Sequence, residues 1–206
     1  MAQILENGIE AGNWYDKYNT KNPIAKYLLE KFLQSVKELL SPAKNDIASI
    51  TEVGCGEGYL TNYLNSLNIT KNIQGCDFSA QIIEIASKNT SDPSIRFYTK
   101  DIYEIDKKEQ ADLIVCCEVL EHLKNPEKVL KKIKQVTNKY CLFSVPNEPV
   151  WRILNLCRGK YIRNFGNTPG HTNHWSSSSF LKLISNYFDI IALRKPLPWT
   201  MVLCKK

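Results

Sequence analysis

Several features that would place a chain in a special class are missing here. The seven cysteines include no C-x-x-C pair and their number is odd, which argues against a disulfide framework. The longest strongly apolar run, LIVCC at 113–117, is far too short to cross a bilayer, and MAQILENGIE has no basic start followed by an apolar stretch. No low-complexity tract or internal repeat occurs. These absences predict a soluble cytoplasmic protein with reduced, buried thiols and no membrane span.

The charge balance also lacks a strong bias. The 206 residues carry a formal net charge of +6, and the lysines alternate with glutamates instead of forming one basic stripe. A solvated surface is the simpler interpretation; nucleic acid is a disfavoured partner that is not excluded. A chain of this length fits one domain with a single core. Nothing in the sequence specifies an oligomeric state.

Short apolar runs alternate with helical patterns from residue 47 onward. The strand-like runs are IASITEV, NIQGCD, SIRFYT, ADLIVCC, YCLFSV, FDIIALR and WTMVLCK. Alternation of this kind predicts a parallel sheet with helices on both faces. The last two runs are joined only by the turn-prone KPLP, so they must pair antiparallel. We therefore predict an α/β fold: a doubly wound, mostly parallel seven-stranded sheet with an antiparallel final strand.

A separate helix precedes this alternation. Asn22 can cap it, Pro23 suits its first position, and apolar residues recur down to residue 40. The preceding stretch GNWYDKYNTKNP contains Trp14 and Tyr15. We predict that this stretch forms a lid over the ligand crevice, which in doubly wound sheets lies at the carboxyl ends of the strands.

Three glycines at alternate positions follow the first strand of the sheet, in EVGCGEG. Gly54, Gly56 and Gly58 occupy a strand-to-helix turn, where glycine permits positive φ or close approach of a ligand to main chain. Exposed N–H groups in such a turn suit a negatively charged or carboxylate-bearing ligand. The alternative is a tight turn that needs glycine only for packing. The spacing differs from G-x-G-x-x-G, which disfavours a dinucleotide.

An acid closes the next strand. Asp77 in IQGCDFS follows Gly54 by 23 residues, where a carboxylate can accept both ribose hydroxyls, and Ser79 is then available to cap the following helix. Together with EVGCGEG and the reversed final strand pair, this resembles the class I S-adenosylmethionine-dependent methyltransferases over about residues 47–205. The resemblance implies a Rossmann-like methyltransferase fold with S-adenosylmethionine as cofactor.

The resemblance also implies roles for particular residues. Glu52 and the Gly54–Gly58 backbone would hold the methionine moiety, and Asp77 the ribose. Phe78 would cover one face of the adenine. Asp101 would bind the adenine amino group with Ile102 beside it, and Glu118 would lie near the sulfonium.

The three histidines of the chain fall in two segments. CCEVLEHL places Glu118, Glu121 and His122 at i, i+3 and i+4, which predicts one face of a helical turn. His171 and His174 lie in a later segment. E-x-x-E-H followed by a distant His, together with VPNE at the end of the fifth strand, resembles small-RNA terminal 2′-O-methyltransferases, in which His174 or His171 would complete a metal site. The same pattern resembles the ubiquinone-biosynthesis O-methyltransferases.

Three interpretations of these residues stay open. A divalent metal, if present, would be held by Glu118, Glu121, His122 and His174. Without a metal, His122 or His174 is the candidate general base that removes the acceptor proton. Alternatively, the acids serve the cofactor and a helix start while the histidines only pack and hydrogen-bond.

The segment 147–175 carries an unusual mixture of aromatic and basic residues. Topology places it over the ligand crevice, where aromatics can wall an acceptor and arginines can pair with a phosphate or carboxylate. An ordinary surface helix and a stacked nucleotide end are the alternatives. The residues concerned are Trp151, Arg152, Arg158, Lys160, Tyr161, Arg163, Phe165 and Trp175.

These patterns predict one methyltransferase domain over 1–206. Its parts are an N-terminal lid and helix (1–45), a cofactor-binding core (47–146), a substrate-covering insertion (147–175) and a final helix and strand pair (176–206). No room is left for a separate recognition domain, which favours O-methylation of a small-molecule acceptor. The alternatives are a metal-dependent RNA-terminal 2′-O-methyltransferase, an NAD-binding oxidoreductase and a non-catalytic cofactor-binding protein.

Overall fold

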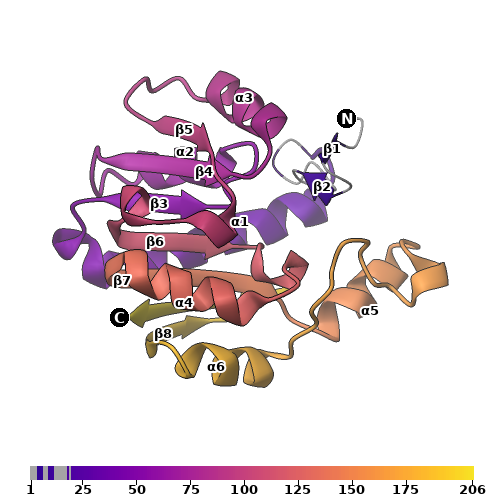
Figure 1. Ribbon diagram of the computed structural model, residues 1–206. Helices are drawn as coiled ribbons and strands as arrows, with labels where there is room; N and C mark the ends of the chain where they lie inside the picture. Colours follow the sequence, from indigo (N-terminus) through magenta and orange to yellow (C-terminus); the bar gives the residue numbers. More distant parts are fainter. Residues whose placement is uncertain (1–3, 7–8, 12–17, 19) are drawn as a thin grey trace.

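A seven-stranded sheet forms the centre of the protein (Figure 1). This computed structural model describes residues 4–6, 9–11, 18 and 20–206, so the predicted lid residues Trp14 and Tyr15 lie outside the described part. The strands of the sheet are β3 (Ile50–Val53), β4 (Ile73–Asp77), β5 (Arg96–Thr99), β6 (Ala111–Cys117), β7 (Thr137–Pro146), β8 (Asp189–Arg194) and β9 (Trp199–Lys205).

The order of the strands is β5-β4-β3-β6-β7-β9-β8. The pairs among β3, β4, β5, β6 and β7 are parallel, and β9 runs antiparallel to both of its neighbours. This arrangement confirms the predicted doubly wound sheet and its reversed final strand. It also brings the carboxyl ends of the parallel strands to one edge, where ligands of such sheets bind.

Helices cover both faces of the sheet. The α-helices are α1 (Pro23–Leu40), α2 (Tyr59–Ser66), α3 (Ala80–Asn89), α4 (Pro126–Val136), α5 (Val150–Cys157) and α6 (Ser177–Ser185). Short 3₁₀ turns are η1 (Ser41–Asp46), η2 (Ile102–Glu104), η3 (Lys107–Glu109), η4 (Leu120–His122) and η5 (Ile162–Asn164). As the sequence predicts, Asn22 caps α1 by accepting from the N–H groups of Ile24 and Ala25.

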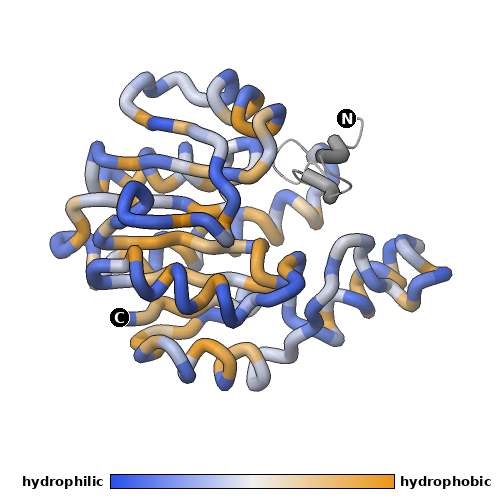
Figure 2. The backbone as a smooth tube through the Cα atoms, viewed as in Figure 1, coloured by the Kyte–Doolittle hydropathy of each residue, from blue (hydrophilic) through white to orange (hydrophobic). Residues whose placement is uncertain are grey.

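Two apolar clusters fill the space between the sheet and its helices. In β6, Leu113 and Val115 pack with α1 and α2 on one face, whereas Ile114 and Cys116 pack with α4 and α6 on the other. Side chains alternate across a strand, so a central strand buried on both faces must be apolar throughout. Figure 2 shows this concentration of apolar residues along the central strands. The core thereby fixes the strand ends that carry the polar residues.

The segment 147–175 leaves the sheet after β7 and returns before α6. In Figure 1 its helix α5 projects from the body of the domain, on the side where the short antiparallel pair β1 (Ile4–Glu6) and β2 (Ile9–Ala11) also lies. The buried Asn155 holds the segment together, because its amide donates to Gly166 O at 2.9 Å. We refer to residues 147–175 as the excursion.

The cysteines are mostly buried, as the sequence predicts. All seven are free, and six of them are buried. Cys157, at the end of α5, is exposed. None of the helices in the described ranges is long and apolar enough to span a membrane.

Candidate functional site

The turn between β3 and α2 holds its glycines in left-handed backbone conformations. The φ angles are 73° at Gly54, 53° at Gly56 and 79° at Gly58. A Cβ on Gly54 would overlap Val119 Cγ2, and one on Gly58 would lie 2.8 Å from Phe97 Cζ. The structure therefore gives the turn conformation and the packing of neighbouring strands as direct reasons for glycine at these two positions.

The main-chain N–H groups of this turn are already used within the protein. Gly54 and Cys55 donate to Cys76 O, at 2.8 and 3.0 Å, and Gly58 donates to Cys55 O at 3.0 Å. Gly56 donates to Asp77 Oδ2 at 3.1 Å. The expectation of exposed N–H donors is wrong for these four groups. These bonds hold the turn in its conformation and tie it to the end of β4.

Asp77 ends β4 beside this turn. Its Oδ1 accepts from Ser79 N at 3.1 Å while Oδ2 accepts from Gly56, and Ser79 caps α3 as predicted. Burial raises the pKa of Asp77 above its usual value, and the hydrogen bonds from Ser79 and Gly56 oppose this shift. A carboxylate has about four acceptor positions, so capacity remains for the hydroxyls of a ribose.

A second group of acids lies behind the turn. Glu52, on β3, is buried and accepts a short hydrogen bond from Thr61 Oγ1. Tyr18 stacks on Tyr59 at the start of α2, with ring centroids 4.5 Å apart and planes 14° from parallel. The pKa of Tyr18 is raised well above its usual value by burial and then by the charges of Glu52 and other neighbours, including Glu118. Tyr18 therefore lies close enough to Glu52 and Glu118 for their charges to affect it; the resemblance assigns these acids to the methionine moiety and the sulfonium.

Glu118 follows β6 at a φ of 60°. Its Oε1 accepts from Ser144 Oγ at 3.0 Å, and its Oε2 accepts from Trp199 Nε1 at 2.6 Å. These donors come from β7 and from the reversed strand β9, so two neighbouring strands fix the carboxylate. Charge-assisted bonds of this length are stronger than those between neutral groups.

The predicted adenine-side residues lie at the ends of β4 and β5. Phe78 directly follows Asp77 and is half-buried. Asp101 is exposed and caps η2 by accepting from Tyr103 N at 2.8 Å, while Ile102 beside it is buried. Glu52, Asp77, Asp101 and Glu118 thus mark successive strand ends along one edge of the sheet.

An aromatic row begins at Trp199 and leads into the excursion. The ring centroids of Trp199 and Trp151 are 6.1 Å apart, and those of Trp151 and His171 are 6.0 Å apart with planes at 26°. His171 meets His122 edge to face at 4.9 Å. Trp151 is itself fixed by donating from Nε1 to Thr168 Oγ1 at 2.8 Å. The row connects the Glu118 carboxylate with the histidines.

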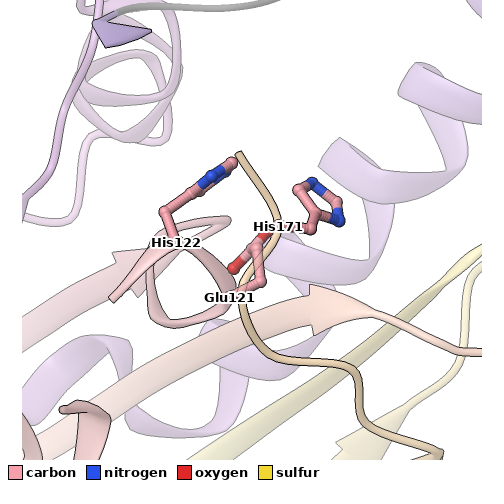
Figure 3. Close-up of side chains that lie close together, drawn as sticks. All are labelled: Glu121, His122 and His171. Atoms are coloured by element: carbon pink, nitrogen blue, oxygen red, sulfur yellow. The ribbon is translucent and has the colours of Figure 1, made fainter. Parts of the chain in front are cut away.

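The returning end of the excursion is bound to η4. Thr172 and Asn173 donate their N–H groups to Glu121 O, at 2.9 and 3.0 Å. Figure 3 shows the result: Glu121 and His122 from η4 face His171 from the excursion. The hydrogen bond between His122 Nδ1 and Gly170 O, at 3.1 Å, requires the proton on Nδ1 and leaves Nε2 as the basic nitrogen.

The structure divides the predicted metal set into different groups. Potential ligand atoms of Glu121, His122 and His171 lie within 4.8 Å of one another, and so do those of Glu148, His171 and His174. Glu118 joins neither group. The predicted common helical face is wrong because Glu118 adopts the left-handed conformation and precedes the 3₁₀ turn, which begins at Leu120.

His171 stands in both groups, whereas the predicted metal set contains His174 in its place. Burial lowers the pKa of His171 from 6.5 to about 3, with smaller contributions from His122, His174 and Arg152. A neutral imidazole is the form that binds metals. The sequence patterns give no role to Tyr18 or Trp199, and they include Glu148 only as the acid of VPNE. Two sequence features pointed towards these residues: the aromatic cluster WYDKYN contains Tyr18, and VPNE contains Glu148. Their positions at the candidate site follow only from the fold.

Comparison with known families and proteins gives consistent matches. A family described as "Methyltransferase domain" matches residues 24–188. The mitochondrial ubiquinone biosynthesis O-methyltransferase of Saccharomyces cerevisiae is 31% identical over 121 residues, covering 55% of this chain and 38% of that protein. The malonyl-[acyl-carrier protein] O-methyltransferase of Bacillus cereus is 29% identical over 121 residues, covering 59% and 43%. The chain spans only about two fifths of the length of these two relatives.

Solved structures share the fold. Magnesium protoporphyrin IX methyltransferase from Synechocystis, solved with bound SAH, superposes with a TM-score of 0.69 at 15% identity, covering 91% of this chain and 89% of that one. The N-methyltransferase NodS from Bradyrhizobium japonicum gives a TM-score of 0.66 at 17% identity, covering 90% and 98%. At these identities the likeness concerns the fold alone.

Proposed function

Because this chain belongs to the family of class I S-adenosylmethionine-dependent methyltransferase domains, we propose that it transfers a methyl group to an oxygen atom of a small-molecule acceptor. The observation that carries the proposal is the link from Glu118 through Trp199 into the aromatic row that ends at His122. It joins the cofactor edge of the sheet to a wall suited to a ring-bearing or apolar acceptor.

The residues along the sheet edge fit the methyl donor. S-adenosylmethionine has a cationic end, and Glu52, Glu118 and the Tyr18 ring supply negative charge and an aromatic face near the glycine turn. Asp77 would accept the ribose hydroxyls. Phe78, Asp101 and Ile102 would hold the adenine. The glycine spacing, which differs from G-x-G-x-x-G, supports this ligand over NAD.

Proton removal would fall to His122. When bound, S-adenosylmethionine would supply an electrophilic methyl group to the acceptor oxygen, with its sulfur as the leaving group. The acceptor hydroxyl loses its proton to Nε2 of His122, the nitrogen left basic by the contact of Nδ1 with Gly170 O. A positioned base contributes about 10²–10⁴-fold, and alignment of the reacting groups ~7–11 kcal/mol. His174 stays a second candidate base.

The choice of oxygen rests on the relatives. The proteins from S. cerevisiae and B. cereus are both described as O-methyltransferases, at 31% and 29% identity. A neutral imidazole is also a suitable base for a hydroxyl but is not needed for a free amine, which attacks before it loses a proton. Oxygen therefore accounts for the position of His122 better than nitrogen does.

The test is methyl transfer from labelled S-adenosylmethionine to a panel of small hydroxylated compounds. Each compound is paired with an analogue whose hydroxyl is blocked and with one carrying an amine instead. We expect labelled methyl ether from the hydroxyl compounds only, with strong loss of turnover in Asp77→Asn. Transfer only to amines, or binding of the cofactor without transfer to any acceptor, would contradict the proposal.

A second candidate is methylation of an RNA terminus assisted by a metal. The exposed Arg158, Lys160 and Arg163 on the excursion, together with the Glu121, His122 and His171 group, favour it. Such an activity would fall steeply with salt as phosphate contacts are lost, and it would require a divalent metal. Salt-independent turnover of a small acceptor decides against it.

A further inference from the structure

Glu148 is a buried acid that the proposed methyl transfer does not use. It lies just after β7, and its side chain is only 9% exposed. Among the described residues, neither of its carboxylate oxygens has a hydrogen-bond partner. A buried carboxylate is normally hydrogen-bonded, paired with a charge or bound to a metal, because the desolvation of its charge is otherwise uncompensated.

The neighbours of Glu148 are cationic or metal-binding groups at long range. His174 Nδ1 lies 3.7 Å from Oε1, and Arg152 Nε lies 3.7 Å from Oε2. Arg152 Nε is also buried and, within the described part of the chain, lacks a hydrogen bond. The arginine therefore accounts for only one side of the carboxylate, and Oε1 faces the histidines.

His171 completes a set of three ligands on this side. One ligand atom each from Glu148, His171 and His174 lies within 4.8 Å of the other two. In a tetrahedral site with bonds of about 2.0–2.1 Å, ligand atoms are ~3.3 Å apart. The separation of 3.7 Å between Glu148 and His174 is already near that value. To bind one ion, the three ligand atoms would have to move from separations of up to 4.8 Å to about 3.3 Å.

We propose that Glu148, His171 and His174 form a divalent transition-metal site that joins the two ends of the excursion. Two imidazoles and one carboxylate suit borderline metals such as Zn²⁺ or Co²⁺, whereas Mg²⁺ prefers oxygen ligands. This site differs from the sequence-predicted set, which contains Glu118, Glu121 and His122 and shares only His174.

The positions of Glu148, His171 and His174 in the chain indicate a structural role for the metal. Glu148 opens the excursion, and His171 and His174 close it 23 and 26 residues later. The main chain already pairs at this base, since Glu148 N donates to Trp175 O at 2.9 Å and Asn147 bridges to Trp175. A metal bound here restrains both ends of the segment that carries Trp151 and α5, and its binding free energy adds to the stability of the folded excursion.

Calorimetric titration with Zn²⁺ tests the site in the full chain. All variants carry Cys157→Ser, which removes the exposed thiol as a competing ligand. We expect one bound Zn²⁺ and no binding of Mg²⁺. His174→Gln, at a largely exposed position, should weaken Zn²⁺ binding about tenfold or more. Glu148→Gln should do the same, and if that variant does not fold, His174→Gln alone decides.

Glu121→Gln is the matched control, because Glu121 belongs to the other group around His171. It should leave the affinity for Zn²⁺ within about twofold of the parent, well below the loss of about tenfold for a true ligand partner. If Glu121→Gln weakens binding and His174→Gln does not, the ion occupies the Glu121, His122 and His171 group and the proposal is wrong. Absence of stoichiometric Zn²⁺ binding to the parent also overturns it.

Hydrogen exchange provides the structural readout. Zn²⁺ should slow exchange of the amides in 150–170 in the parent and leave it unchanged in His174→Gln. Equal exchange in the parent with and without Zn²⁺ would refute the joining role. Neither measurement depends on methyl transfer, so a failure of this proposal is distinguishable from a failure of the proposed function.

Discussion

The Trp199 indole donates from Nε1 to Glu118 Oε2 at 2.6 Å, which ties the reversed strand β9 to the acid at the end of β6. The acid keeps a second donor, Ser144. The Glu118 carboxylate is thus held by donors from two strands. Trp199 also packs against Trp151, the next ring of the aromatic row. The relationship makes β9 part of the candidate active site as well as of the core.

Trp199→Phe should keep the aromatic packing and remove the hydrogen bond to Glu118. Bonds to charged groups contribute about 1.5–3 kcal/mol and neutral ones about 0.5–1.5 kcal/mol. The matched control is Trp151→Phe, which removes a bond to the neutral hydroxyl of Thr168. Urea unfolding should show a larger loss of stability in Trp199→Phe, and equal losses would mean that the Glu118 bond has no special strength.

Gly54→Ala should destabilise the protein on two grounds. The left-handed conformation costs about 1–2 kcal/mol for a residue with a Cβ, and overpacking against Val119 adds roughly 1–3 kcal/mol. Adding Val119→Ala should recover the packing part only. Thermal unfolding of the single and double variants measures both parts, and a double variant no more stable than Gly54→Ala would exclude the steric explanation.

Binding of S-adenosylmethionine should weaken in acid through Asp77. The ribose hydroxyls donate to the ionised carboxylate, so affinity follows its ionised fraction. Burial raises the pKa of Asp77 above 3.8. As the pH falls, Asp77 should therefore become protonated, and the affinity for S-adenosylmethionine should drop, at pH values where an unperturbed aspartate is still charged. Titrations at several pH values, with circular dichroism to verify folding, should show this loss in the parent and a flat, weaker profile in Asp77→Asn. A parallel pH profile in both proteins would remove Asp77 from the cofactor site.

His122→Asn should lower the turnover number by about 10²–10⁴-fold, since it removes the base while retaining a polar side chain. The affinity for S-adenosylmethionine should stay unchanged. Rapid-quench measurement of the methyl-transfer step distinguishes loss of the base from slower product release. Full turnover in His122→Asn would transfer the role of base to His174 or show that none is needed.

Much of the fold could be predicted because the determining signals are local. The apolar alternation and the short KPLP link determine the sheet and its reversed strand, and Asn22 and Ser79 cap helices where the sequence indicates. The pairing of Asp77 with the glycine turn is also accessible, because both lie at ends of adjacent strands.

The arrangement of the histidines could not be predicted in the same way. Spacing places Glu118 on the same helical face as Glu121, but the left-handed backbone at Glu118 breaks that face before η4 begins. His171 reaches His122 only because the returning excursion bonds to Glu121 O, a contact between residues about fifty positions apart. Neither effect leaves a periodic signal in the sequence.

The central place of β9 has a consequence for biosynthesis. Residues 199–205 fill the gap between β7 and β8, and Trp199 pairs there with Pro146. The glycine turn and Asp77 precede these residues by more than a hundred positions, so they are synthesised well before the indole that holds Glu118. Until β9 has paired with β7, Glu118 therefore lacks one of its two side-chain donors.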